Sequence, residues 1–318
     1  MREVRDYCIV SYRYREKSIS ISMELEQHID KQSFLRVGLI GDPVAHSYSP
    51  RFQQAAFDAC GIPARYELWQ TGESELPARV ASLLVPQSLG ANITIPYKEA
   101  VLPLLDVVDP LATRIGAVNT IVHRNEYLYG YNTDAPGLLH ALVELGVGKL
   151  REPHYLATLQ GDNRLNTKDA FLFAGYTAVL LGAGGAARGA AFALVNASVE
   201  RLIIVNRKLE RAQRLAAELQ QESNCQVFCL NDPEFLIPYP TSLIINATPI
   251  GMHVADKEGN KEAENASPMP AEVLARFAPD TVVFDMVYNP TQSQLLCQAR
   301  TLGLRAVNGL SMLLHQGA

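Results

Sequence analysis

The segment VLLGAGGAARGAAFAL, residues 179–194, has the residue types and spacing of a phosphate-binding turn. After an apolar run come, in order, Gly182, Ala183, Gly184, Gly185, Ala186 and Ala187, which fit the pattern G-x-G-x-x-A. In this pattern the first glycine permits a tight turn and the second admits a pyrophosphate, while the last small residue lets helix and strand pack closely. The N–H groups that begin the helix then bind the anion. The motif predicts a dinucleotide site, and the alternative is a tight turn without a ligand.

Three residues at the end of the next apolar run bear on which dinucleotide is bound. They are Asn206, Arg207 and Lys208 in the segment IIVNRK. A carboxylate at this position would bond the ribose hydroxyls and favour NAD. Arg207 can instead bind a 2′-phosphate through its planar fork, and Lys208 adds positive charge. We therefore predict NADP as the cofactor, against the alternative of two solvated cations.

Four segments of the first half are dense in polar groups at positions typical of loops. They are residues 45–50 (AHSYSP), 90–98 (GANITIPYK), 115–122 (IGAVNTIV) and 130–137 (GYNTDAPG). Together they offer hydroxyls, amides, one ammonium and one carboxylate. Because a dinucleotide domain says nothing about the substrate, we expect these segments to supply the substrate site.

The composition of the chain indicates what kind of protein carries these polar groups. The chain has 318 residues, of which 48% are hydrophobic and 19% charged, as in an ordinary globular protein long enough for two domains. Its formal charge of -5 argues against nucleic acid or an anionic membrane as a partner. The five scattered cysteines form no C-x-x-C pair, so we predict no metal site. The chain lacks an apolar run of about 18 residues and a secretory signal, and we therefore predict a cytoplasmic location.

In the first half, strands and helices are expected to alternate. Residues 35–40 and 65–70 read as strands, and residues 89–98 as a strand that runs into a loop. Between them we predict helices over residues 51–62 and 76–84, the first preceded by Pro50 and ended by Gly61. This alternation predicts an α/β layer.

The second half shows the same alternation more clearly. Strands are predicted at residues 177–182, 201–207, 241–248 and 281–287, and helices at 186–195 and 209–221. The strands are continuous apolar runs, which are typical of a parallel sheet buried on both faces. The fold class is therefore α/β, with an N-terminal α/β substrate domain, a doubly wound Rossmann-like domain and the active site in the cleft between them.

We assign domain boundaries from these patterns. Residues 34–134, joined by 306–318, form the substrate-binding domain, and residues 135–305 form the dinucleotide domain. Within the latter, residues 147–176 are polar without clear periodicity and read as an insertion or domain-edge loop. Residues 1–33 read as a poorly ordered extension, or as translation from upstream of an internal start at Met23.

The motifs resemble those of the shikimate dehydrogenase family. The four polar segments and the glycine turn share in this resemblance, together with NATPIGM (246–252), DMVYNP (285–290) and NGLSMLLHQGA (308–318). It runs from about Val37 to the C-terminus, with all motifs in the family's order. The resemblance implies reversible NADPH-dependent reduction of 3-dehydroshikimate to shikimate, a step of aromatic amino-acid biosynthesis.

The resemblance also implies roles for individual residues. Ser47 and Ser49 would bind the substrate carboxylate, and the hydroxyl ligands would be Asn92, Thr94, Asn119 and Gln316, with Tyr288 as a further contact. The cofactor residues of the later motifs would be Thr248, Met286, Gly309 and Met312. Lys98 and Asp134 would be the catalytic pair.

The chemistry of the pair agrees with that assignment. Hydride that reaches a ketone carbon leaves negative charge on oxygen, which an ammonium can stabilise and protonate. We assign Lys98 as proton donor in reduction and Asp134 as its orienting partner. The alternatives are a solvated lysine and a helix N-cap, respectively.

Two other functions remain open at this point. One is a quinate/shikimate dehydrogenase with relaxed cofactor use, and the other is a non-catalytic nucleotide-binding sensor of the same fold. The residues at 206–208 argue against the first, and the retention of Lys98 and Asp134 argues against the second. The partner we predict is a small-molecule substrate, with the chain a monomer or homodimer.

Overall fold

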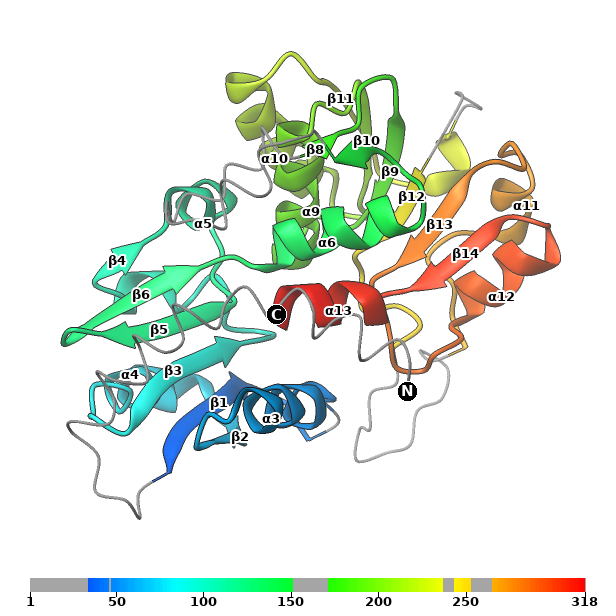
Figure 1. Cartoon of the computed structure of the whole chain (residues 1–318). Helices are drawn as coiled ribbons and strands as arrows, with labels where there is room; N and C mark the ends of the chain where they lie inside the picture. Colours follow the sequence, from blue (N-terminus) through cyan, green and yellow to red (C-terminus); the bar gives the residue numbers. More distant parts are fainter. Residues whose placement is uncertain (1–33, 46, 151–170, 237–242, 253–264, 318) are drawn as a thin grey trace.

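The computed structural model describes residues 34–45, 47–150, 171–236, 243–252 and 265–317. The predicted extension 1–33 and residues 151–170 of the predicted insertion lie outside them. The described residues form two six-stranded sheets and a separate pair of short strands (Figure 1). Within this described part of the chain, no helix has both the length and the apolar character needed to cross a membrane.

The first half forms a mixed sheet with the strand order β2-β1-β3-β5-β6-β4 (Figure 1). Its strands are β1 (Leu35–Gly41), β2 (Ala64–Gln70), β3 (Ser88–Ile93), β4 (Val107–Val108), β5 (Thr120–Arg124) and β6 (Tyr127–Tyr131). β1 pairs in parallel with β2 and β3, whereas β5 runs antiparallel to β3 and β6. The ends of β1, β3 and β6 and the start of β5 therefore meet at one edge of the sheet.

The helical segments of this half are α3 (Ser49–Cys60), η1 (Glu73–Glu75), α4 (Leu76–Ala81), η2 (Leu102–Leu104) and α5 (Pro110–Ile115). Gly61 ends α3 with a φ of +67°, as its predicted stop requires. The β5–β6 hairpin differs from the prediction of loops at 115–122 and 130–137. Its turn places Asn125 and Glu126 at φ of +51° and +64° without a glycine, so the usual sequence signal of such a hairpin is missing.

The second half forms an all-parallel sheet with the strand order β11-β10-β9-β12-β13-β14. Its strands are β9 (Thr177–Leu181), β10 (Arg201–Val205), β11 (Gln226–Leu230), β12 (Leu243–Asn246), β13 (Val282–Asp285) and β14 (Arg305–Asn308). This confirms the predicted doubly wound sheet. The strand order reverses between β9 and β12, where such sheets bind ligands at their carboxyl edge.

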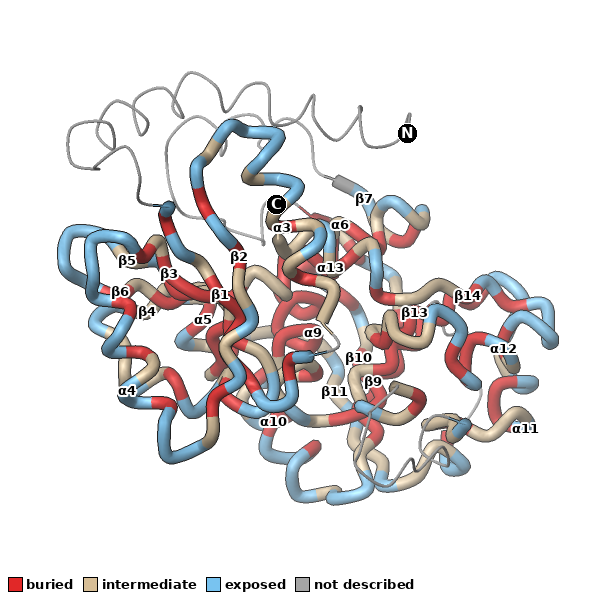
Figure 2. The backbone as a smooth tube through the Cα atoms, turned by 90° about the horizontal axis from the view of Figure 1, so that it is seen from below, coloured by how far each residue is buried: buried red, intermediate tan, exposed pale blue. Residues whose placement is uncertain are grey.

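Both faces of the second sheet are buried (Figure 2). The helical segments around it are α9 (Gly185–Asn196), α10 (Leu209–Glu222), η3 (Pro233–Phe235), α11 (Ala271–Leu274) and α12 (Gln294–Thr301). Ala178 and Leu180 of β9 belong to one core cluster with α9 and α10, whereas Val179 and Leu181 belong to another with α11 and α12. This alternation explains why the strands read as continuous apolar runs.

The C-terminal helix packs against the helix that follows the first sheet. α6 (Asp134–Glu144) follows β6, and α13 (Leu310–Gly317) lies beside it (Figure 1). The approach is close because Gly137 has no side chain: a Cβ there would lie 3.0 Å from the backbone nitrogen of Gln316. Gln53 Nε2 on α3 also donates to the carbonyl of Gly317 at 3.2 Å. The C-terminal helix thus contacts elements of the first half.

Two predicted segments differ in detail from the structure. Residues 306–308, assigned to the substrate-binding part, pair with β13 as strand β14, so the return to the first half begins after them. At the ends of the stretch 147–176, β7 (Lys149–Leu150) and β8 (Phe171–Leu172) form a two-stranded antiparallel sheet. Phe171 and Phe173 are buried in the same cluster as α9, so the end of this stretch is part of the core rather than an unpacked loop.

Candidate active site

A chain of hydrogen bonds crosses the edge of the first sheet where β3 ends and β5 begins. Asn92 Nδ2 donates to Thr120 Oγ1 at 3.1 Å, and Thr120 donates to Asn119 Oδ1 at 3.2 Å. Asn119 Nδ2 donates to Thr133 Oγ1 at 2.9 Å and to Gln316 Oε1 at 3.2 Å. Three residues predicted to bind substrate hydroxyls are thus brought together from β3, the start of β5 and α13.

Ser47, Ser49 and Tyr288 form a second group beside this chain. Ser47 Oγ donates to Ser49 Oγ at 3.1 Å, just after β1. Tyr288 follows β13 in the other half of the molecule, yet its hydroxyl lies near Ser47 and its ring centroid lies 5.6 Å from that of Tyr48. Burial is the main cause that raises the pKa of Tyr288, so its hydroxyl keeps its proton at neutral pH.

Tyr66 on β2 joins the two groups and was not among the predicted residues. Its hydroxyl donates to Asn92 Oδ1 at 2.8 Å and lies near Ser49, and burial raises its pKa. Thr120 and Thr133 were also missed, although each stands next to a predicted residue in the segments GAVNT and NTD. The signal for Tyr66 is weaker, because it is one inward position of an ordinary alternating strand.

Thr94 is placed differently from the other predicted hydroxyl ligands. It follows β3, where its backbone N–H donates to the carbonyl of Ile40 at 2.9 Å. Its methyl group occupies the space in front of Gly41, where an added Cβ would lie 2.4 Å from Thr94 Cγ2. In the described part of the chain, the hydrogen bonds between Asn92 and Gln316 do not pass through the Thr94 hydroxyl.

Lys98 and Asp134 form a close ion pair. Lys98 Nζ lies 2.7 Å from Asp134 Oδ2, and their side chains are only 18% and 14% exposed. The N-cap of α6 is Thr133, so Asp134 is the first residue of the helix rather than its cap. Its negative charge at a helix N-terminus is favourable, and its carboxylate remains available to orient the ammonium.

The glycine turn leaves space for an anion. Gly182 has a φ of +111°, which residues with a Cβ rarely adopt, and its N–H donates to the carbonyl of Val205 at 2.8 Å. At Gly184 an added Cβ would meet no protein atom within 4 Å. Gly184 is the N-cap of α9 and offers no side-chain hydrogen bond to the first N–H groups of the helix. An open approach to an uncapped helix start fits the pyrophosphate of a dinucleotide.

The other predicted cofactor residues follow neighbouring strands of the second sheet. A Cβ at Gly182 would lie 3.2 Å from Thr248 Cγ2, so Thr248 borders the glycine turn. A Cβ at Gly309 would lie 2.4 Å from the carbonyl oxygen of Met286, so the segments after β13 and β14 are in contact. Met312 is buried in the core cluster that Met286 packs against. Thr248, Met286 and Gly309 therefore lie at the carboxyl edge of the second sheet, whereas Met312 lies in the core.

A buried carboxylate holds the segments that follow β12 and β13. Asp285 Oδ1 accepts from Asn246 Nδ2 at 2.9 Å and from the backbone N–H of Val287 at 3.0 Å, while Oδ2 bonds to Ser293 Oγ. Burial raises the pKa of Asp285, against the lowering effect of these three donors. Asn246 Oδ1 accepts from the hydroxyl of Thr248 at 2.7 Å. The network thus fixes Thr248 beside the glycine turn.

Asn206, Arg207 and Lys208 follow β10, the strand whose last residue bonds to the glycine turn. Asn206 Nδ2 donates to the carbonyl of Lys208 at 2.8 Å, which closes the turn into α10. Arg207 and Lys208 are exposed. Two accessible cations beside the nucleotide turn fit the ribose 2′-phosphate that distinguishes NADP from NAD.

The glycine turn lies next to the segment that carries the ion pair. A Cβ at Gly185 would lie 3.6 Å from Oε1 of Glu99, the residue after Lys98. One turn further along α9, a Cβ at Gly189 would lie 4.0 Å from Asn132 Oδ1, two residues before Asp134. The two sets of residues, far apart in sequence, therefore meet at the junction of the two halves.

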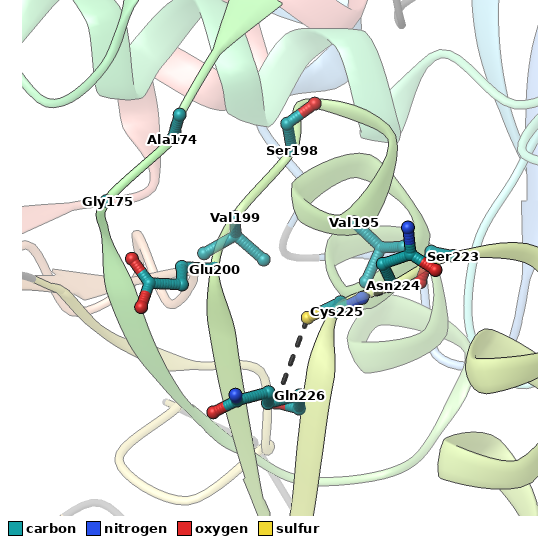
Figure 3. Close-up of a pocket in the computed structure, with 10 residues that line it drawn as sticks. All are labelled: Ala174, Gly175, Val195, Ser198, Val199, Glu200, Ser223, Asn224, Cys225 and Gln226. Carbon is teal, nitrogen blue, oxygen red and sulfur yellow. Dashed lines mark hydrogen bonds between the residues drawn. The ribbon is translucent and has the colours of Figure 1, made fainter.

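A cavity of about 470 Å³ lies elsewhere, at the amino ends of β10 and β11 (Figure 3). Its lining includes Ser198, Glu200 and Cys225. Burial raises the pKa of the Cys225 thiol to about 11, so the thiol is protonated at neutral pH. Since ligands of doubly wound sheets bind at the carboxyl ends of the strands, this cavity does not belong to the candidate active site.

Fold and site together define an oxidoreductase of the two-domain, dinucleotide-dependent α/β class. Residues 39–121 match the family model described as "Shikimate dehydrogenase substrate binding domain", and residues 165–274 match "Shikimate / quinate 5-dehydrogenase". The chain belongs to the shikimate dehydrogenase family.

Individual relatives agree with this membership. Shikimate dehydrogenase (NADP(+)) of Symbiobacterium thermophilum is 40% identical over 286 residues, which cover 89% of this chain and 86% of that protein. The structure of shikimate 5-dehydrogenase from Thermus thermophilus in complex with NADP(H) and shikimate has a TM-score of 0.70 at 35% identity, and covers 90% of this chain and 91% of that one. The ligand-free 5-ketofructose reductase of a Gluconobacter strain also has a TM-score of 0.70, at 30% identity, with 90% and 91% covered.

Proposed function

We propose that this protein catalyses the reversible NADPH-dependent reduction of 3-dehydroshikimate to shikimate, in the biosynthesis of aromatic amino acids. The observation that carries the proposal is the Lys98–Asp134 pair, with its 2.7 Å contact, beside the glycine turn. A sensor that only binds a nucleotide has no use for a shielded ammonium held by a carboxylate, so this pair favours catalysis.

The residues have separate tasks in the reaction. The hydroxyls of Ser47 and Ser49 donate to the substrate carboxylate, with Tyr288 beside them. Asn92, Asn119 and Gln316 orient the substrate hydroxyls, as does Thr94. These groups exchange hydrogen bonds with one another and with neighbouring threonines in the structure, and such bonds are available for replacement by hydroxyls of a ligand.

Proton transfer falls to Lys98. Gly182, Gly184 and the start of α9 would hold the pyrophosphate of NADP, and Arg207 and Lys208 would hold its 2′-phosphate. The bound nicotinamide supplies or accepts the hydride. During reduction, Lys98 Nζ donates its proton to the substrate oxygen as charge develops there, and Asp134 keeps the ammonium aligned. In oxidation, the neutral amine takes the same proton back.

The test is an assay of the purified protein with 3-dehydroshikimate, followed by the loss of NADPH absorbance. We expect turnover with NADPH and a much lower kcat/KM with NADH. Parallel assays of the reverse reaction use shikimate, and quinate is offered with both cofactors. Oxidation of quinate with NAD as efficient as that of shikimate with NADP would favour the relaxed quinate/shikimate enzyme, whereas nucleotide binding without any turnover would favour the sensor. A cytoplasmic monomer or homodimer remains our prediction for the working form.

A further inference from the structure

Arg188 connects the nucleotide half of the molecule to the substrate half. It lies near the start of α9, where its backbone N–H donates to the carbonyl of Gly184 at 2.8 Å. Its Nε donates to the carbonyl of Ile115, the last residue of α5, at 2.6 Å. A terminal nitrogen of the same guanidinium donates to Glu218 Oε2 on α10 at 2.7 Å. One side chain, 19% exposed, thus spans three helices.

The substrate half is shaped to receive this guanidinium. The last carbonyl groups of a helix have no partner within it, and Arg188 satisfies that of Ile115. Gly116 follows with a φ of +70°, and a Cβ added to it would lie 3.2 Å from Arg188 Nη2. A second contact runs in parallel: Arg114 donates to Asn196 Oδ1 of α9 at 3.2 Å.

A short segment leads from this contact to the active site. Only Gly116, Ala117 and Val118 separate Ile115 from Asn119. The N–H of Val118 donates to the carbonyl of Lys98 at 2.7 Å. The carbonyl of Ala117 accepts from the side chain of Asn132 at 3.0 Å, two residues before Asp134. The backbone that Arg188 holds is therefore the same backbone that holds Lys98 and Asn119.

We propose that Arg188 is a positioning residue that fixes the glycine turn relative to Lys98 and Asn119, and so couples nucleotide binding to substrate binding. The inference rests on the function proposed above. Its physical basis is the bond from the rigid, planar guanidinium to the carbonyl of Ile115, the residue that leads into the segment holding Lys98 and Asn119. The guanidinium of Arg188 bonds to protein groups, Ile115 and Glu218, and not to a ligand. Its effect on the reaction is therefore indirect, through the positions of Lys98 and Asn119.

The test compares Arg188→Lys with Glu218→Gln. Lysine keeps the charge but cannot reproduce the fork, whereas Glu218→Gln leaves the bond to Ile115 in place. Isothermal titration measures the dissociation constants of NADP⁺ and shikimate, each alone and in the presence of the other. We expect Arg188→Lys to bind each ligand alone within about threefold of wild type, but to lose most of the coupling between them.

Kinetics provide the second measurement. We expect kcat of Arg188→Lys to fall about ten- to a hundredfold, with KM for 3-dehydroshikimate little changed, because misplacement of reacting groups affects the chemical step most. Glu218→Gln is expected to stay within about twofold of wild type in both measurements. If Arg188→Lys does not fold by circular dichroism, Arg188→Gln replaces it, since the shorter neutral side chain also lacks the guanidinium that bonds Ile115.

The outcomes separate the two proposals. Wild-type coupling and wild-type kcat in a folded Arg188→Lys or Arg188→Gln variant overturn the positioning role and leave the proposed function intact. Equal losses in Glu218→Gln also overturn it, because the contact to Ile115 would not be the cause. A wild-type protein that fails to reduce 3-dehydroshikimate refutes the proposed function, and the inference that rests on it falls as well.

Discussion

The Lys98 ammonium and the Asp134 carboxylate are shielded from water by their surroundings, with 18% and 14% of their side chains exposed. A charge-assisted hydrogen bond in such a setting is stronger than at the surface and holds a defined geometry. The structure thus favours an oriented proton donor over the solvated lysine that the sequence leaves open.

At this scale we expect Lys98→Ala to lower kcat about a hundred- to ten-thousandfold, with the affinity for shikimate less changed. The reason is that the variant loses the proton donor but keeps the residues that orient the substrate. Steady-state kinetics and shikimate titration measure both quantities. Lys149→Ala, which removes an exposed lysine of β7, is the matched control and should behave as wild type. Near-normal turnover of Lys98→Ala would refute the assignment.

Arg207 carries a second prediction, on cofactor choice. We expect Arg207→Ala to raise KM for NADPH about ten- to a hundredfold while KM for NADH stays nearly constant, because only NADPH has a phosphate for the guanidinium to bind. Arg214→Ala, which removes an exposed arginine in the second turn of α10, serves as control. An equal rise in KM for both cofactors would show that Arg207 does not bind the 2′-phosphate.

Among the elements, the glycine turn before α9 requires glycine at two positions for different physical reasons. Gly182 needs its φ of +111°, whereas Gly184 has a φ of −90° that any residue adopts and faces open space. We expect Gly182→Ala to cost about 1–3 kcal/mol of unfolding free energy from backbone strain. Gly184→Ala should stay within about 0.5 kcal/mol of wild type without ligand, yet weaken NADP⁺ binding at least about tenfold.

Chemical denaturation and NADP⁺ titration of both variants test this contrast. The reasoning depends on the empty space before Gly184 being the place of the pyrophosphate. Wild-type affinity for NADP⁺ in Gly184→Ala would mean that the nucleotide does not approach the turn there.

The elements also differ in how well local sequence patterns predicted them. Four strands of the second sheet, β9, β10, β12 and β13, were predicted to within about two residues, because burial on both faces leaves a continuous apolar run. The two edge strands, β11 and β14, were not predicted. The β5–β6 hairpin was not, because Asn125 and Glu126 form its turn without the usual glycine. The short strand β8 was missed for a related reason: two residues are too few to show a period.

For the molecule as a whole, the contact between α6 and α13 joins its C-terminal helix to the rest. His315 Nε2 lies 2.9 Å from Glu144 Oε1, and Ser311 donates to Glu144 Oε2 at 3.0 Å. His140 stacks on His315, with ring centroids 5.2 Å apart, and meets Phe171 edge-on. Gln316 follows directly, so these contacts also support a predicted substrate ligand.

The ionisation of His140 links this contact to stability. Burial, followed by the neighbouring His315, lowers the pKa of His140 from 6.5 to about 4. Between these values the unfolded chain binds more protons than the folded one, so acid favours unfolding. The contribution of His140 is fully present above about pH 6.5 and is lost as the pH falls toward 4.

We therefore expect the unfolding free energy of the wild type to fall more steeply between neutral pH and about pH 4.5 than that of His140→Gln. Urea denaturation at several pH values measures the difference. Comparing the two proteins cancels the contributions of Asp285 and other groups that both retain. Parallel pH profiles would contradict the assignment of this acid sensitivity to His140.

By itself, the sequence determined the parallel sheet, the glycine turn and the cations after β10, because each depends on residues that are neighbours in the chain. Only the tertiary structure decided that Lys98 meets Asp134, 36 residues away, and that Gln316 reaches Asn119 across 197 residues. It also revealed Tyr66 between Ser49 and Asn92, and Arg188 between the two halves. Such contacts depend on how sheets and helices pack against one another, and no local period or spacing encodes that packing.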